Sequence, residues 1–117
     1  MSERDFPPSL PVTVRSIETA VPIGAAVKDM MALQGDDAAI SPKVRELIGL
    51  AVSAQIPCVY CIYFHTKAAK QFGASDAEVK EALAAAAQVR KWSTILNGSM
   101  YDEATWQKEV DAMFSGQ

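Results

Sequence analysis

The sequence of 117 residues is notable first for what it has little of: two cysteines, one histidine and no long hydrophobic stretch. Its longest apolar runs, 47–52 and 82–87, are much shorter than the roughly 20 residues that a membrane-spanning helix requires. No stretch alternates between polar and apolar residues as a half-buried strand does. These absences argue against a membrane protein and against a fold built on sheets.

Charge is modest and mixed in sign. Eleven Lys and Arg residues stand against 14 Asp and Glu, for a net charge of −3, and the basic residues are scattered along the chain. A nucleic-acid or anionic-membrane partner is therefore not expected, because such partners select basic patches. The first eight residues are partly acidic and lack the apolar core of a signal peptide. We expect a cytoplasmic protein, in which a permanent structural disulfide is uncommon.

Prolines and helix-end signals divide the chain into a short arm and one helical domain. Three prolines in residues 1–11 predict an extended arm, and residues 12–117 are long enough for a single domain with its own core. We predict an all-α single-domain bundle of about five or six helices. The expected helices cover residues 16–33, 42 to the break before Cys58, 58–71, 75–96 and 102–114.

Local motifs support these helix boundaries. Ser41 followed by Pro42 is typical of a helix start, and Ser75 with Glu78 forms a capping-box pattern. Gly73 suits a helix end. Pro57 should keep Ile56 out of the helical region and end the second helix. That helix is apolar over much of its surface, which predicts a central position in the fold.

The two cysteines and the histidine share one spacing pattern. Cys58, Cys61 and His65 are three and four residues apart, so a helix places them on one face. A C-x-x-C pair in a chain without other cysteines indicates a redox pair or half of a metal site. The helix N-terminus favours a thiolate at Cys58, and His65 can accept the proton of Cys61 or stabilise its thiolate. The second sulfur can close a disulfide once the first is oxidised.

Glu46 is the fourth candidate, in the preceding helix. If the two helices pack antiparallel, its carboxylate could orient His65 or a water and pass protons. Alternatives remain open from the residues alone: an inert buried cysteine pair, a metal half-site in which Glu46 would be the one further ligand, and a solvated Glu46. Several aromatic residues are expected in the core or at subunit contacts: Tyr60, Tyr63, Phe64, Trp92 and Trp106.

The spacing Glu46, Cys58-x-x-Cys61, His65 resembles the active-site pattern of the AhpD-like alkylhydroperoxidases. These enzymes belong to the carboxymuconolactone decarboxylase superfamily, and the similarity extends over about residues 41–87. The resemblance implies an all-helical fold completed by trimer or hexamer formation. It also implies hydroperoxide reduction through a Cys58–Cys61 disulfide that a dithiol, thioredoxin-type or lipoyl-type donor recharges, with no cofactor and no metal.

The resemblance further implies a role for each residue. Cys61 would attack the peroxide, Cys58 would resolve the intermediate and face the donor, and Glu46 with His65 would relay protons. The helix-dipole argument instead favours Cys58 as the more acidic thiol. The namesake enzymes carry a histidine where this chain has Tyr60, and a phenol is a poor base near neutral pH. A shorter relay and weaker peroxidase activity are therefore expected.

Two other functions remain open on the sequence. The first is a carboxymuconolactone decarboxylase-like lyase, which would not need the cysteine pair. The second is a non-enzymatic redox-sensing module whose oligomeric state follows the Cys58–Cys61 disulfide. The preferred interpretation is a peroxiredoxin-type oxidoreductase: a thiol-dependent peroxidase or a disulfide reductase.

Overall fold

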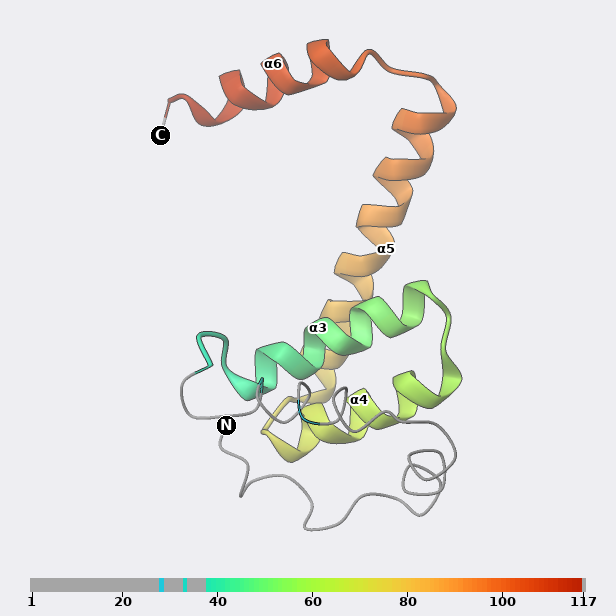
Figure 1. Ribbon diagram of the computed structural model, residues 1–117, viewed down its shortest axis with the longest axis vertical. Coiled ribbons are helices and arrows are strands. Elements are labelled where there is room, and N and C mark those ends of the chain that lie inside the picture. Colours follow the sequence, from blue (N-terminus) through green and yellow to red (C-terminus); the bar gives the residue numbers. More distant parts are fainter. Residues whose placement is uncertain (1–27, 29–32, 34–37, 117) are drawn as a thin grey trace.

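The structure is a computed structural model that describes residues 28, 33 and 38–116. These residues form four helices and no strand, named as in Figure 1: α3 (Pro42–Gln55), α4 (Val59–Gln71), α5 (Asp76–Gly98) and α6 (Glu103–Phe114). The all-α class is confirmed over this part of the chain. The predicted arm over 1–11 and most of the predicted helix over 16–33 lie outside the described residues, so five or six helices and completion by oligomerisation stay predictions.

Helix α3 starts as its sequence predicts and ends for a different reason. Ser41 is the N-cap, its hydroxyl accepting from the Val44 N–H at 3.3 Å, and Pro42 is the first helical residue. Ile56 keeps helical angles (φ −57°, ψ −44°), so the expectation that Pro57 excludes it from the helical region is wrong. Pro57 has no N–H to continue the helix. The N–H of Cys58 bonds the Ser53 carbonyl instead, at 2.9 Å.

Helix α4 packs against α3 and ends in a tight turn at Gly73. The Gly73 N–H bonds the Lys70 carbonyl at 3.0 Å, and the Ala74 N–H bonds the Ala69 carbonyl at 2.9 Å. This pair of bonds is a Schellman motif, which requires a left-handed residue, and Gly73 has φ +93°. Ala69 and Ala74 are both buried in the turn, and Lys70 pairs with Asp76 at 2.9 Å across it.

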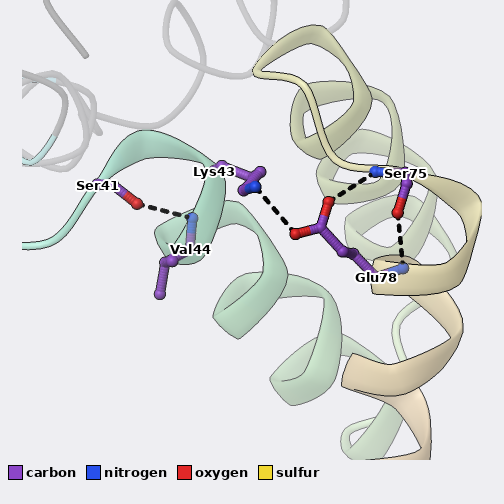
Figure 2. Close-up of polar contacts among 5 residues, drawn as sticks. All are labelled: Ser41, Lys43, Val44, Ser75 and Glu78. Atoms are coloured by element: carbon purple, nitrogen blue, oxygen red, sulfur yellow. Dashed lines mark hydrogen bonds and ion pairs between the residues drawn. The ribbon is translucent and has the colours of Figure 1, made fainter.

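Helix α5 is tied to the start of α3 through its own N-terminal cap. Glu78 accepts from the Ser75 N–H at 2.9 Å, and the Ser75 hydroxyl accepts from the Glu78 N–H at 3.0 Å, which confirms the predicted capping box. Figure 2 shows the second Glu78 oxygen turned toward Lys43 of α3, and the two groups are 2.9 Å apart. The same carboxylate therefore caps α5 and pairs with α3.

The end of α3 makes a second connection to α5. The Gln55 amide donates to the Ala86 carbonyl at 2.7 Å, and the Arg90 Nε donates to the Gln55 side-chain oxygen at 2.7 Å. Helix α3 thus contacts both α4 and α5, which confirms its predicted central position. Beyond these contacts α5 extends away from the α3–α4 pair, and α6 lies at its far end (Figure 1).

Burial within the single chain is limited. On α3, Glu46, Leu50 and Ser53 are buried, whereas Val44, Ile48 and Val52 are about half exposed. Trp92 is 54% exposed and Trp106 39% exposed, so neither lies in a core of this chain. Within the described residues, no helix is long and apolar enough to cross a membrane.

Candidate redox site

The two cysteines are joined at the start of α4. Cys58 and Cys61 form a disulfide, with their Cα atoms 5.3 Å apart. Cys58 is the N-cap of α4, and its sulfur accepts from the Cys61 N–H at 3.2 Å. A helix N-cap presents unpaired N–H groups and the positive end of the helix dipole. Both sulfurs therefore lie where negative charge on sulfur is stabilised in the reduced protein.

Glu46 and His65 meet between the two helices. The His65 Nδ1 lies 2.7 Å from a Glu46 carboxylate oxygen, although the residues are 19 positions apart in the sequence. Glu46 is 1% exposed. Because a carboxylate only accepts hydrogen bonds, Nδ1 is the donor and Nε2 is the nitrogen left to take up a proton. The contact brings two of the predicted site residues together, and the pairing satisfies the buried carboxylate. That Glu46 orients His65 for proton transfer stays a prediction.

The neighbouring aromatic residues differ in their relation to this pair. The Phe64 ring lies edge-on to the His65 ring, with centroids 5.2 Å apart. Tyr60, between the cysteines, is 85% exposed, and Tyr63 is 68% exposed with Lys67 Nζ 5.6 Å from its ring centroid. Tyr60 and Tyr63 are thus not core residues of the single chain, and their predicted alternative, a subunit contact, stays a prediction.

Two residues of α3 belong to the site but were not predicted from the sequence. Ser53 is 2% exposed, its hydroxyl donates to the Gly49 carbonyl at 2.5 Å, and its own carbonyl accepts the Cys58 N–H. Gly49 lies directly against the ring of His65. A glycine inside a helix, and a serine directly after the apolar run 47–52, are the signals that could have drawn attention to them.

A shallow groove of about 370 Å³ runs along α4, and neither cysteine nor His65 is among the residues that line it. It is lined by Val59, Ile62, Tyr63, Thr66, Lys67 and Lys70. Its walls are mainly apolar and it carries two ammonium groups at its far end. In the part of the chain that the structure describes, no three Cys, His, Asp or Glu side chains are grouped to hold a metal ion.

Comparison with known proteins gives the site a family context. The model of the carboxymuconolactone decarboxylase family matches residues 23–100, which include Glu46, both cysteines and His65. The chain belongs to this family. One curated relative, "Uncharacterized protein 4 in cox locus" of Paracoccus denitrificans, is 35% identical over 54 residues, or 46% of this chain. The matched segment is 49% of that relative, so the chain spans about half its length.

No solved structure matches the chain significantly. Family membership confirms the resemblance drawn from the cysteine and histidine spacing at the level of the carboxymuconolactone decarboxylase family. The name of that relative specifies no activity.

Proposed function

We propose that this family member is a thiol-dependent hydroperoxidase or disulfide reductase that uses the Cys58–Cys61 pair. The observation that carries the proposal is the 2.7 Å contact between His65 and the buried Glu46. His65 lies one helical turn after Cys61 on α4. A buried carboxylate that orients an imidazole beside a nucleophile is the usual arrangement for activating a thiol. The cytoplasm, where dithiol donors are kept reduced, is the proposed compartment.

The first half of the cycle consumes the peroxide. The Cys61 thiolate attacks the terminal peroxide oxygen, the O–O bond breaks, and the alkoxide takes a proton from His65 and leaves as the alcohol. Cys61 is then a sulfenic acid. The Cys58 thiolate attacks its sulfur and forms the disulfide, and the displaced hydroxide is protonated to water.

The second half restores the dithiol. A donor carrying two thiols attacks the Cys58 sulfur, forms a mixed disulfide and releases the Cys61 thiolate. The second donor thiol then displaces Cys58, so that the donor leaves oxidised and the pair is reduced. In total, one hydroperoxide and one dithiol become one alcohol, one water and one donor disulfide. In disulfide reduction a substrate disulfide takes the place of the peroxide: the Cys61 thiolate displaces one substrate thiol, Cys58 displaces the other and closes the Cys58–Cys61 disulfide, and the donor then restores the dithiol as above.

The groove on α4 favours a substrate with an apolar part. Val59, the neighbour of Cys58 in the sequence, lines it with Ile62 and Tyr63, and this apolar wall suits an alkyl chain. An alkyl hydroperoxide should therefore react at a lower concentration than hydrogen peroxide. A larger apolar side chain at Thr66, within the groove, would alter KM for the alkyl substrate more than for hydrogen peroxide.

Cysteine variants test the proposed cycle. Reduced protein supplied with a dithiol should consume alkyl hydroperoxide, and Cys61→Ser should abolish turnover. Cys58→Ser is the matched control: without dithiol it should consume about one equivalent and stop as a sulfenic acid that a sulfenate-specific reagent traps. Unchanged turnover by Cys61→Ser would rule out this mechanism. Carboxymuconolactone turnover without either cysteine would support the lyase alternative, and a redox-dependent oligomer without peroxide consumption would support the sensing module.

We also propose that the chain works as a homotrimer or homohexamer. The far half of α5, the turn after it and α6 expose a series of large apolar residues: Val89, Trp92, Ile95, Met100, Tyr101, Met113 and Phe114. Exposed apolar area on this scale is typical of a protein interface. A second copy is the natural partner, because most soluble oligomers are symmetric assemblies of one chain.

The oligomer proposal is tested by charge placed on α5. Trp92→Glu should reduce the mass measured by light scattering to that of a smaller species, because it buries a charge in the contact. Lys91→Glu, at the neighbouring exposed position, is the matched control and should leave the mass unchanged. A wild-type protein that is monomeric at micromolar concentration would contradict the proposal.

A further inference from the structure

Gly49 occupies a position of α3 from which a side chain would enter the space of the His65 ring. A Cβ atom built on Gly49 would lie 2.6 Å from Nδ1, 2.7 Å from Cε1 and 2.9 Å from Cγ of His65. Protein carbon atoms in van der Waals contact are separated by about 3.5–4.0 Å. Any side chain at this position therefore has to displace the whole ring, and not only a flexible tip.

The displaced ring would lose its contact with Glu46. The Nδ1 atom that the new Cβ would meet is the same atom that lies 2.7 Å from the Glu46 carboxylate. Glu46 comes from α3, one turn before Gly49, and is almost fully buried, so it has little freedom to follow the ring. The Ser53 hydroxyl, one turn later in α3, donates a hydrogen bond to the Gly49 carbonyl.

We infer that Gly49 is a positioning residue: its missing side chain lets His65 approach α3 closely enough to be held by Glu46. The inference deepens the proposed function, on which it rests for the consequence that Cys61 reactivity depends on Gly49. The geometry also explains a glycine inside a helix, where its backbone freedom is otherwise unfavourable. Gly49 itself touches neither peroxide nor sulfur.

The effect on reactivity is measured with Gly49→Ala and Gly49→Val. The alanine variant should slow alkylation of Cys61 in the reduced protein by about tenfold, since displacement of a catalytic group by about 1 Å can cost up to 10²-fold. The valine variant should slow it further. Gly98→Ala is the matched control, because a Cβ on Gly98 of α5 meets no atom within 4 Å.

The same variants have readouts that do not depend on catalysis. His65 is the only histidine, so ¹⁵N-histidine labelling gives one set of ring signals that report which nitrogen carries the proton. Wild type should show the proton on Nδ1, and Gly49→Ala should lose that preference. Gly49→Ala should also lower Tm with His65 present but raise Tm in a His65→Ala background, where the space is free and alanine favours the helix.

These readouts separate the two claims. Unchanged ring signals in Gly49→Ala, or the same Tm change with and without His65, would overturn the inference about Gly49. If His65→Ala leaves Cys61 alkylation unchanged, the proposed proton relay fails instead, and the ring signals and the Tm comparison still decide the role of Gly49. Loss of reactivity in Gly49→Ala that persists equally in the His65→Ala background would also overturn the inference.

Discussion

The α3–α4 pair has buried polar groups, whereas α5 and α6 have no buried residue, although both regions expose large apolar side chains. Glu46 and Ser53 are 1% and 2% exposed between the first two helices. On the outer helices, Trp92 is 54% exposed and Phe114 is 59% exposed. A buried carboxylate is tolerated only with a partner, and exposed large apolar side chains are favoured only where something will cover them.

This difference assigns the two regions different tasks. The α3–α4 pair supplies its own polar partners, since Glu46 meets His65 and Ser53 meets Gly49 within one chain. The α5–α6 arm does not cover its own apolar surface. We therefore expect substitutions in the first region to alter thiol chemistry, and substitutions in the second to alter assembly or local stability.

The largest expected effect comes from Glu46→Ala in the first region. Removing the carboxylate leaves His65 without the group that orients it, so Cys61 alkylation in the reduced protein should slow by about 10²-fold, the scale of general acid–base catalysis. Glu46→Gln is the control: it keeps an acceptor oxygen and should slow Cys61 alkylation less than Glu46→Ala does. Alkylation rates by mass spectrometry check this. Equal alkylation rates in wild type and Glu46→Ala would contradict the expectation that substitutions in the α3–α4 pair alter thiol chemistry.

A smaller effect is expected at the two turns that end α4 and α5. Both are Schellman turns with a residue at positive φ, Gly73 at +93° and Met100 at +50°. A side chain at positive φ costs about 1–2 kcal/mol. Gly73→Ala should therefore lower the free energy of unfolding by about 1 kcal/mol, and Met100→Gly should raise it by up to about 1 kcal/mol.

Urea unfolding curves measure these changes. A Cβ on Gly73 would meet no atom within 4 Å, so the Gly73→Ala result isolates the backbone effect. Changes of the same sign in the two variants would show that Met100, which is 87% exposed in the single chain, is held by packing in the assembly. Repeating the Met100→Gly measurement in the Trp92→Glu background, which removes the proposed subunit contact, shows whether packing in the assembly is the cause.

The smallest effect is expected at the ion pair that joins the regions. The ammonium group of Lys43, followed by the Ser75 N–H, lowers the pKa of Glu78 below its ordinary 4.5. A lowered folded-state pKa stabilises the protein above the ordinary value, and that contribution is lost as the pH falls through the lowered one. Glu78→Gln should therefore flatten the decline of Tm below pH 4.5.

Salt and a neighbouring residue provide the checks. High salt should reduce the difference between wild type and Glu78→Gln, because the pair is exposed to solvent. Glu81→Gln, at an exposed position one turn along α5, is the control and should keep the wild-type profile. A Glu81 variant that flattens the curve as much as Glu78→Gln would assign the effect to net charge alone.

Helix ends could be predicted because their determinants are local. Ser41, Ser75 and Asp102 each cap a backbone N–H three residues ahead, so their patterns can be recognised without knowledge of the fold. The predicted end of the fourth expected helix was two residues short, since α5 includes Asn97 and Gly98 and turns at Met100. A methionine gives no sequence signal for a left-handed turn.

Burial could not be predicted to the same degree. The apolar surface of α3 suggested a helix covered on most sides, but Val44, Ile48 and Val52 are about half exposed in the single chain. Trp92 and Trp106, which were expected in the core or at subunit contacts, are also partly exposed in the single chain. Hydrophobicity shows that a side chain favours burial, but not whether the chain itself or a second copy covers it.

The sequence alone determined the helical class over the described residues, the starts of the four helices and the spacing of Cys58, Cys61 and His65, because each depends on residues within about one or two turns. Only the tertiary structure decided that Glu46 meets His65 and that Gly49 leaves room for the ring. These contacts depend on which faces of α3 and α4 pack together. Side-chain packing between the helices makes that choice, and the spacing of residues along one helix does not predict it.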